Sequence, residues 1–129
     1  MTDILLATDA DWLVDDVEAA LGGAHLIHRV RAGVDVVPAI EQVDPAVVLL
    51  DLQIGNMGGV AACLATKQRV AMGDLEDRPV LLLLDRDVDV FLAREAQADG
   101  WLVKPLDAFR TLRAIEAALA GDPVTEAAG

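Results

Sequence analysis

Five short apolar runs alternate with five segments of helical periodicity along this chain, and the alternation limits the possible fold more than any other feature of the sequence. The apolar runs suit strands that are covered on both faces of a sheet, and the run that ends abruptly at Asp51 is the clearest of them. The expected strands are residues 4–7, 26–30, 46–50, 80–84 and 101–103. The expected helices are residues 9–21, 36–43, 60–72, 88–96 and 109–119. This order predicts an α/β fold, in which right-handed crossovers place helices on both faces of a parallel sheet.

The size and charge of the chain limit the number of domains it can form and the kinds of partner it can bind. Its 129 residues predict one domain, which we place at residues 1–121, followed by a flexible tail at residues 122–129. The formal net charge of −12 argues against a nucleic-acid partner or an anionic membrane surface, because both are bound through cationic side chains. The sequence has no apolar run near the ~20 residues of a membrane helix and no basic region at its start, so we expect a cytoplasmic protein without membrane insertion.

Chemistry in an open parallel sheet is expected at the carboxyl ends of its strands. In this sequence those ends carry Thr8 and Asp9, Asp51, Leu84 and Asp85, and Lys104. Asp9 and Asp51 would repel each other unless a cation lies between them, and Mg²⁺ prefers such oxygen ligands. A carboxylate can also attack phosphorus to form an aspartyl phosphate, while a metal and a lysine neutralise the transferring group. The alternative for Asp9 is that it caps the following helix.

Two segments of the chain carry a family resemblance. Residues 46–59 read AVVLLDLQIGNMGG, an aliphatic strand followed by an aspartate and a polar, glycine-rich loop. Residues 95–106 read EAQADGWLVKPL, with an aromatic residue before Leu-x-Lys-Pro. Both segments resemble the receiver domain of bacterial two-component response regulators, and the resemblance extends from Ile4 to Leu119. It implies a flavodoxin-like, doubly wound sheet of five parallel strands in the order 2-1-3-4-5, with five helices.

The resemblance also implies roles for individual residues. Asp51 matches the phosphorylated aspartate, and Lys104 matches the lysine that contacts the phosphoryl group. Mg²⁺ would be held by Asp9, by Asp51 and by the backbone carbonyl of Gln53, and the peptide bond after Lys104 would be cis. Trp101 matches the aromatic switch residue. The implied function is that of a stand-alone response regulator of a phosphorelay rather than an enzyme, which receives phosphate from a histidine kinase or a phosphotransfer protein and acts on an unidentified downstream protein by contact.

The sequence departs from the family pattern at the same strand ends. Thr8 stands where the family has a first acidic residue, which removes one carboxylate from the metal shell. Leu84 stands where the family has the hydroxyl residue that couples the phosphoryl group to the aromatic switch, and neither Leu84 nor Asp85 can replace that hydroxyl. Gly55 replaces the loop proline. These departures favour an atypical switch on an intact fold.

Two other functions stay open from the sequence. One is a pseudo-receiver, which keeps the fold as a scaffold and is never phosphorylated. The other is a Mg²⁺-dependent phosphohydrolase with an aspartyl nucleophile, although such enzymes need a second aspartate where this chain has Gln53. We expect Cys63 to be a small core residue, His25 and His28 to lie on an edge strand without chemistry, and the acidic residues around Asp85 to form a solvated loop. The acidic residues of that loop are Asp85, Asp87 and Asp89.

Overall fold

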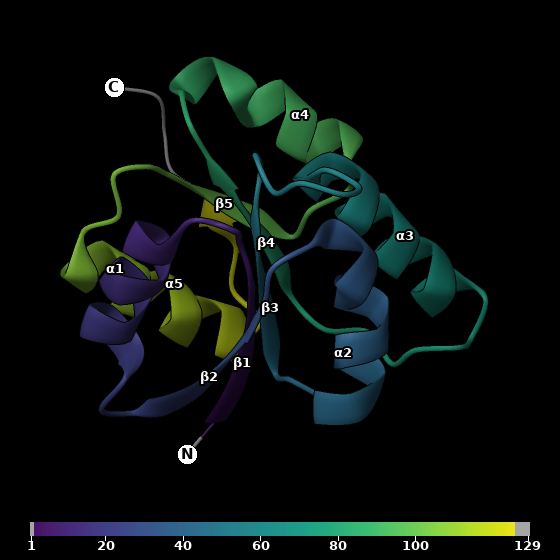
Figure 1. The fold of residues 1–129 in the computed structure, drawn as a ribbon, viewed down its shortest axis with the longest axis horizontal. Coiled ribbons are helices and arrows are strands. Elements are labelled where there is room, and N and C mark those ends of the chain that lie inside the picture. The colour runs from purple at the N-terminus through teal and green to yellow at the C-terminus, as the bar shows by residue number, and fades with distance from the viewer. Residues whose placement is uncertain (1, 126–129) are drawn as a thin grey trace.

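The computed structural model describes residues 2–125, and its centre is a twisted parallel sheet (Figure 1). The strands are β1 (Thr2–Ala7), β2 (His25–Val30), β3 (Val47–Asp51), β4 (Val80–Leu84), β5 (Gly100–Val103) and β6 (Val124–Thr125). They pair in the order β2-β1-β3-β4-β5-β6, and every pair of neighbouring strands within residues 2–125 is parallel. The predicted order 2-1-3-4-5 of the first five strands is confirmed, and β2 is an edge strand as expected.

Five α-helices cover the two faces of the sheet. They are α1 (Asp11–Leu21), α2 (Val36–Val43), α3 (Gly59–Ala71), α4 (Val90–Glu95) and α5 (Ala108–Leu119). Two short 3₁₀ turns, η1 (Gly33–Asp35) and η2 (Asp87–Asp89), lead into α2 and α4. Helices α1 and α5 lie on one side of the sheet, and α2, α3 and α4 lie on the other (Figure 1).

The strands divide their side chains between two aliphatic cores. Leu5, Leu50 and Leu82 pack with α2, α3 and α4 on one face of the sheet. Leu6 and Leu49 pack with α1 and α5 on the opposite face. Successive strand residues point to opposite faces, so strands buried on both sides must be apolar at every position, which explains the continuous apolar runs in the sequence.

The first helix begins at Asp11, two residues later than the sequence predicts. The Thr8 hydroxyl accepts a hydrogen bond from the Ala10 amide at 3.0 Å, and the Asp9 carboxylate turns toward the Gly55 amide. The residue at the helix N-cap position is Ala10, and it makes no side-chain cap. The alternative role of Asp9 as a helix cap is therefore wrong, because its side chain is used elsewhere.

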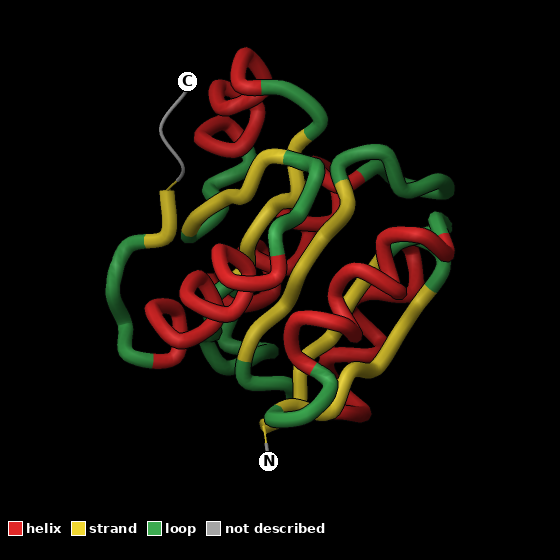
Figure 2. The backbone as a smooth tube through the Cα atoms, turned by 90° about the vertical axis from the view of Figure 1, so that its left-hand side faces the viewer, coloured by secondary structure: helices red, strands yellow, loops and turns green. Residues whose placement is uncertain are grey.

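Strand β6 occupies part of the segment that we expected to be a tail. Val124 is buried against Leu102 and Ala118, and its strand pairs with β5 at the sheet edge (Figure 2). Gly100 permits this pairing, since a Cβ atom there would lie 2.1 Å from the Val124 carbonyl oxygen. A strand of two residues has no periodicity, so the sequence pattern could not reveal it. Residues 126–129 lie outside the described part of the chain.

Candidate functional site

The sheet brings the ends of β1, β3, β4 and β5 to one edge. Ala7 pairs with Leu50, and Asp51 at the end of β3 pairs with Leu83. Leu84 then pairs with Val103, so Lys104 follows at the same level. Thr8, Asp9, Asp51, Asp85 and Lys104 therefore gather at the carboxyl edge of the sheet, where the sequence analysis places the candidate site.

Asp51 is the most buried carboxylate of this group, with a side chain that is 3% exposed. Its Oδ1 accepts hydrogen bonds from the Lys104 ammonium at 2.5 Å and from the Gln53 amide at 3.0 Å. Its Oδ2 accepts a hydrogen bond from the Thr8 hydroxyl at 2.7 Å. A buried charge needs a partner and hydrogen bonds to offset its lost hydration, and Asp51 has both.

Asp9 lies beside this pair but is exposed to solvent. Its Oδ2 accepts a hydrogen bond from the Gly55 amide at 3.2 Å, which ties the β1–α1 loop to the loop that follows β3. The Gly55 position is close to the carboxylate, because a Cβ atom there would meet Asp9 Oδ2 at 3.4 Å. The two predicted metal-binding carboxylates, Asp9 and Asp51, therefore come from neighbouring loops at one edge.

Asp85 contacts two residues of the candidate site, although the sequence, which also places it at a strand end, favours a solvated acidic loop there. Its Oδ1 accepts a hydrogen bond from Lys104 Nζ at 3.0 Å, and its Oδ2 accepts one from Gln53 Nε2 at 2.7 Å. Partial burial works to raise the pKa of Asp85, but the hydrogen bonds from Gln53 and Lys104 and the charges of Lys104 and Arg86 together lower it. The available signal was its place directly after β4, between β3 and β5.

The rest of that loop is also more structured than expected. Asp89 is buried, and its Oδ2 accepts a hydrogen bond from the Arg86 amide at 3.1 Å at the start of η2. A carboxylate at this place satisfies an amide that the turn leaves without a backbone partner. The prediction of a solvated loop is therefore wrong for Asp85 and Asp89.

The two predicted switch residues share one core. Leu84 is fully buried at the end of β4, and Trp101 is 7% exposed on β5. Both belong to the core beneath α2, α3 and α4, and the Arg94 guanidinium lies 5.6 Å from the centre of the Trp101 ring. The tryptophan therefore lies inward in this structure, next to a strand end that offers no hydroxyl.

The remaining sequence predictions concern residues away from the site. Cys63 is fully buried, as expected of a core residue, and burial raises the pKa of its thiol to about 11. His25 and His28 lie on the edge strand β2, and His28 Nε2 lies 2.9 Å from Asp3 Oδ1. The Lys104–Pro105 peptide bond is cis, as the resemblance implies.

The oxygen donors at this edge can be tested against Mg²⁺. Asp9 and Asp51 bring two carboxylates to this edge, and the family resemblance implies the backbone carbonyl of Gln53 as a third donor. Mg²⁺ accepts hard oxygen donors of this kind when water completes its shell. Thr8 contributes a neutral hydroxyl in place of a third carboxylate. Within residues 2–125, no group of three or more acidic, histidine or cysteine side chains forms a metal cluster. By chemical type alone, the oxygen donors suit Mg²⁺, at lower negative charge than three carboxylates would provide.

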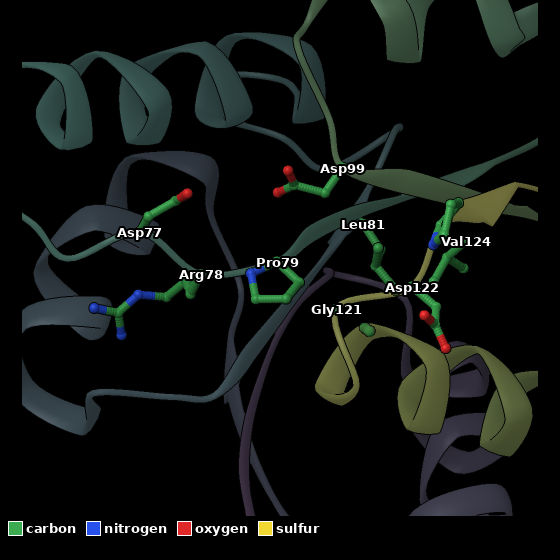
Figure 3. Close-up of a pocket in the computed structure, with 10 residues that line it drawn as sticks. Asp77, Arg78, Pro79, Leu81, Asp99, Gly121, Asp122 and Val124 are labelled. Carbon is green, nitrogen blue, oxygen red and sulfur yellow. The ribbon is translucent and has the colours of Figure 1, made fainter.

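A cavity of about 400 Å³ lies at the other edge of the sheet (Figure 3). Its walls include Pro79, Asp99, Asp122 and Val124, which stand at or near the amino ends of β4, β5 and β6. Asp99 accepts hydrogen bonds from the Lys67 ammonium and from the Val80 amide, so its carboxylate joins two structural elements. The cavity is one strand length away from Asp51 and does not take part in the candidate site.

Comparison with known proteins defines the class of fold. No protein-family model matches the chain. A protein from Chloroflexus aurantiacus described as a response regulator superposes with a TM-score of 0.82 at 23% identity, covering 92% of this chain and 98% of that one. The signal receiver domain of a signal transduction histidine kinase from Syntrophus aciditrophicus gives 0.80 at 23% identity, with coverages of 94% and 92%.

A third similar structure is the activated N-terminal receiver domain of RstA from Klebsiella pneumoniae, with a TM-score of 0.79, 22% identity and coverages of 91% and 97%. The chain therefore has the flavodoxin-like fold of response-regulator receiver domains. Within residues 2–125, no helix is both long enough and apolar enough to cross a membrane.

Proposed function

We propose that this protein is a response-regulator receiver that accepts a phosphoryl group on Asp51 and transmits the signal by protein–protein contact. The observation that carries the proposal is the buried ion pair between Asp51 and Lys104 at the carboxyl edge of a receiver fold. A carboxylate oxygen can attack phosphorus to form an acyl phosphate, and a nearby ammonium neutralises the charge of the transferring group. The contact between these two side chains supports the roles that the sequence resemblance implies for them.

The transfer follows from these two side chains. A carboxylate oxygen of Asp51 attacks phosphorus on a phosphohistidine donor, and a new O–P bond forms. The donor's P–N bond breaks, and the imidazole leaves with the electron pair and takes up a proton from water. Lys104, at 2.5 Å from Asp51 Oδ1, holds positive charge beside the transferring group throughout. Mg²⁺ held by Asp9, Asp51 and the Gln53 carbonyl would supply further positive charge for the phosphoryl oxygens.

The donor in this proposal is a histidine kinase or a phosphotransfer protein, and the recipient of the signal is another protein. The structural neighbours are signalling domains rather than enzymes. An acidic surface with a net charge of −12 suits neither nucleic acid nor an anionic membrane, and it agrees with work in the cytoplasm. We place the receiver unit at residues 1–121, although β6 packs on it as a further strand.

A second candidate is a pseudo-receiver that works without phosphorylation. Two observations favour it: the Thr8 hydroxyl donates a hydrogen bond to Asp51 Oδ2, and the Lys104 ammonium donates one to the Asp85 carboxylate. Each contact must weaken before a phosphoryl group can be bound. The phosphohydrolase alternative has less support, since Gln53 uses its side chain to bind Asp85 rather than to act as a second acid.

The test is phosphorylation by a small donor. We expect acetyl phosphate with Mg²⁺ to produce a phosphoprotein that hydroxylamine cleaves, detected by intact-protein mass spectrometry. Asp51→Asn should abolish it, because an amide is not a nucleophile. The matched control is Asp15→Asn, an exposed aspartate on α1 with the same charge change, which should label like the native protein. Labelling that survives Asp51→Asn would disprove the assignment, and an unlabelled native protein would favour the pseudo-receiver.

A further inference from the structure

We infer that Asp85 restrains Lys104 and competes with the incoming phosphoryl group for its ammonium, so that Asp85 is a positioning residue that sets how readily this site takes an anion. The inference rests on the proposed function of Asp51. It concerns a residue that stands directly after β4, next to Leu84. No role in phosphoryl transfer follows for this residue from the resemblance alone.

The contacts of Lys104 define the restraint. Its ammonium donates to Asp51 Oδ1 and also to Asp85 Oδ1, at 3.0 Å. The Lys104 side chain is 9% exposed, so few water molecules reach it, and two of its three N–H donors are taken by carboxylates. A phosphoryl oxygen that approaches the ammonium must therefore displace one of these carboxylates or share the remaining donor.

The other oxygen of Asp85 is also held. Gln53 Nε2 donates a hydrogen bond to Asp85 Oδ2 at 2.7 Å, and this bond links the loop after β3 to the loop after β4. The Asp85 side chain is about one third exposed, and Gln53 is exposed to solvent. Both side chains can therefore turn outward into water, while the backbone stays in place.

Electrostatics give the direction of the effect. Asp51 and Asp85 both contact the single ammonium of Lys104, so these three side chains already carry more negative than positive charge. A phosphoryl group adds further negative charge within a few ångströms of Asp85, and like charges at that range repel strongly when water is partly excluded. Asp85 therefore opposes anion binding while it faces Lys104, and neutralising it should make the site more receptive.

The structure contains its own reporter for this arrangement. The Trp12 ring of α1 lies 6.0 Å from Lys104 Nζ, within the range of a cation–π contact, and its side chain is accessible to solvent. When the ammonium moves from Asp85 toward an anion, the environment of Trp12 changes. Trp12→Phe identifies the part of the fluorescence signal that comes from this ring.

The first experiment compares initial labelling rates with acetyl phosphate and Mg²⁺. Asp85→Asn should be labelled about three- to fivefold faster than the native protein, the size expected when a partly exposed charge pair is removed. Asp85→Glu should stay within about twofold of the native rate, because it restores the carboxylate. Asp15→Asn controls for the change in net charge. A rate for Asp85→Asn equal to or below the native rate, in a protein that is labelled, overturns the inference.

The second experiment separates this inference from the proposed function. Binding of inorganic phosphate at constant Mg²⁺ is measured by isothermal titration calorimetry in the native protein, in Asp85→Asn and in the double variant Asp85→Asn/Lys104→Gln. Trp12 fluorescence is followed alongside in the two proteins that keep Lys104. Asp85→Asn should bind phosphate about fivefold more tightly, and the gain should vanish without the ammonium. Equal affinities in the native protein and Asp85→Asn, including no binding by either, overturn the inference. If no variant is labelled but the affinity gain is present, the proposed function fails and the role of Asp85 stands.

Discussion

Two aspartate–lysine pairs lie at opposite edges of the same sheet, and their N–O distances are equal. Asp51 and Lys104 lie 2.5 Å apart at the carboxyl edge, and Lys67 and Asp99 lie 2.5 Å apart at the amino edge. The side chains of the first pair are 3% and 9% exposed, whereas Asp99 is 42% exposed. Ion pairs with equal N–O distances therefore differ in interaction energy, because water screens the second pair and not the first.

The hydrogen-bond donors that surround Asp51 and Asp99 also differ. Asp99 also accepts a hydrogen bond from the Val80 amide, which connects the start of β4 to the turn before β5. Asp51 accepts hydrogen bonds from Thr8, Gln53 and Lys104, which follow three different strands. A short ion pair alone does not indicate a functional site. Burial, together with partners from converging loops, distinguishes the carboxyl edge.

The largest effect that would sharpen this comparison is the loss of Lys104. Lys104→Met leaves the buried Asp51 without its cation, and we expect the free energy of unfolding at neutral pH to fall by about 3 kcal/mol. The measurement is urea denaturation followed by circular dichroism. Lys67→Met is the matched control, and it should cost less than about 1 kcal/mol because Asp99 stays hydrated. Similar losses in the two variants would remove the distinction between the two edges.

A smaller effect is expected when β6 is released from β5, with which it pairs at Gly100. In Gly100→Ala the new methyl group would lie 2.1 Å from the Val124 carbonyl oxygen, so β6 must leave β5 and expose Val124. We expect a loss of about 2 kcal/mol, the value of one buried valine, with labelling at Asp51 unchanged. Gly23→Ala is the control, because an added Cβ there meets nothing within 4 Å. Protection of the Val124 amide from hydrogen exchange in Gly100→Ala would contradict the expected release of β6.

The smallest effect is a pH dependence at the carboxyl edge. The pKa of Asp85 is lowered in the folded protein, so its ionised form stabilises the fold above the ordinary value of 3.8, and this contribution is lost as the pH falls through the folded value. The stability difference between the native protein and Asp85→Asn should therefore shrink as the pH falls below 3.8. Urea denaturation over a series of pH values measures it. A difference that grows in acid would mean that Asp85 is not stabilised by Lys104.

Much of this architecture could be predicted from the sequence. Apolar runs covered on both faces must form the inner strands of a parallel sheet, and each crossover places a helix on one face or the other. Without any coordinates, the carboxyl-edge rule then selects the strand-end residues Thr8, Asp9, Asp51, Leu84, Asp85 and Lys104. Helix boundaries were less predictable: Asp9 follows β1 in a helical pattern, but its carboxylate binds the Gly55 amide far away in the sequence.

What the sequence alone determined is therefore the parallel α/β class and the first five strands, because these depend on local periodicity. The ends of these strands also predicted that Asp51 and Lys104 lie at one edge of the sheet, while the strand order was implied by the family resemblance. Only the tertiary structure decided that Asp85 accepts hydrogen bonds from both Lys104 and Gln53. The same holds for the hydrogen bond from the Thr8 hydroxyl to Asp51 and for the packing of Val124 beside Gly100. These contacts join residues from separate loops or strands. Their energies depend on distance and on excluded water, and neither quantity exists before the chain has folded.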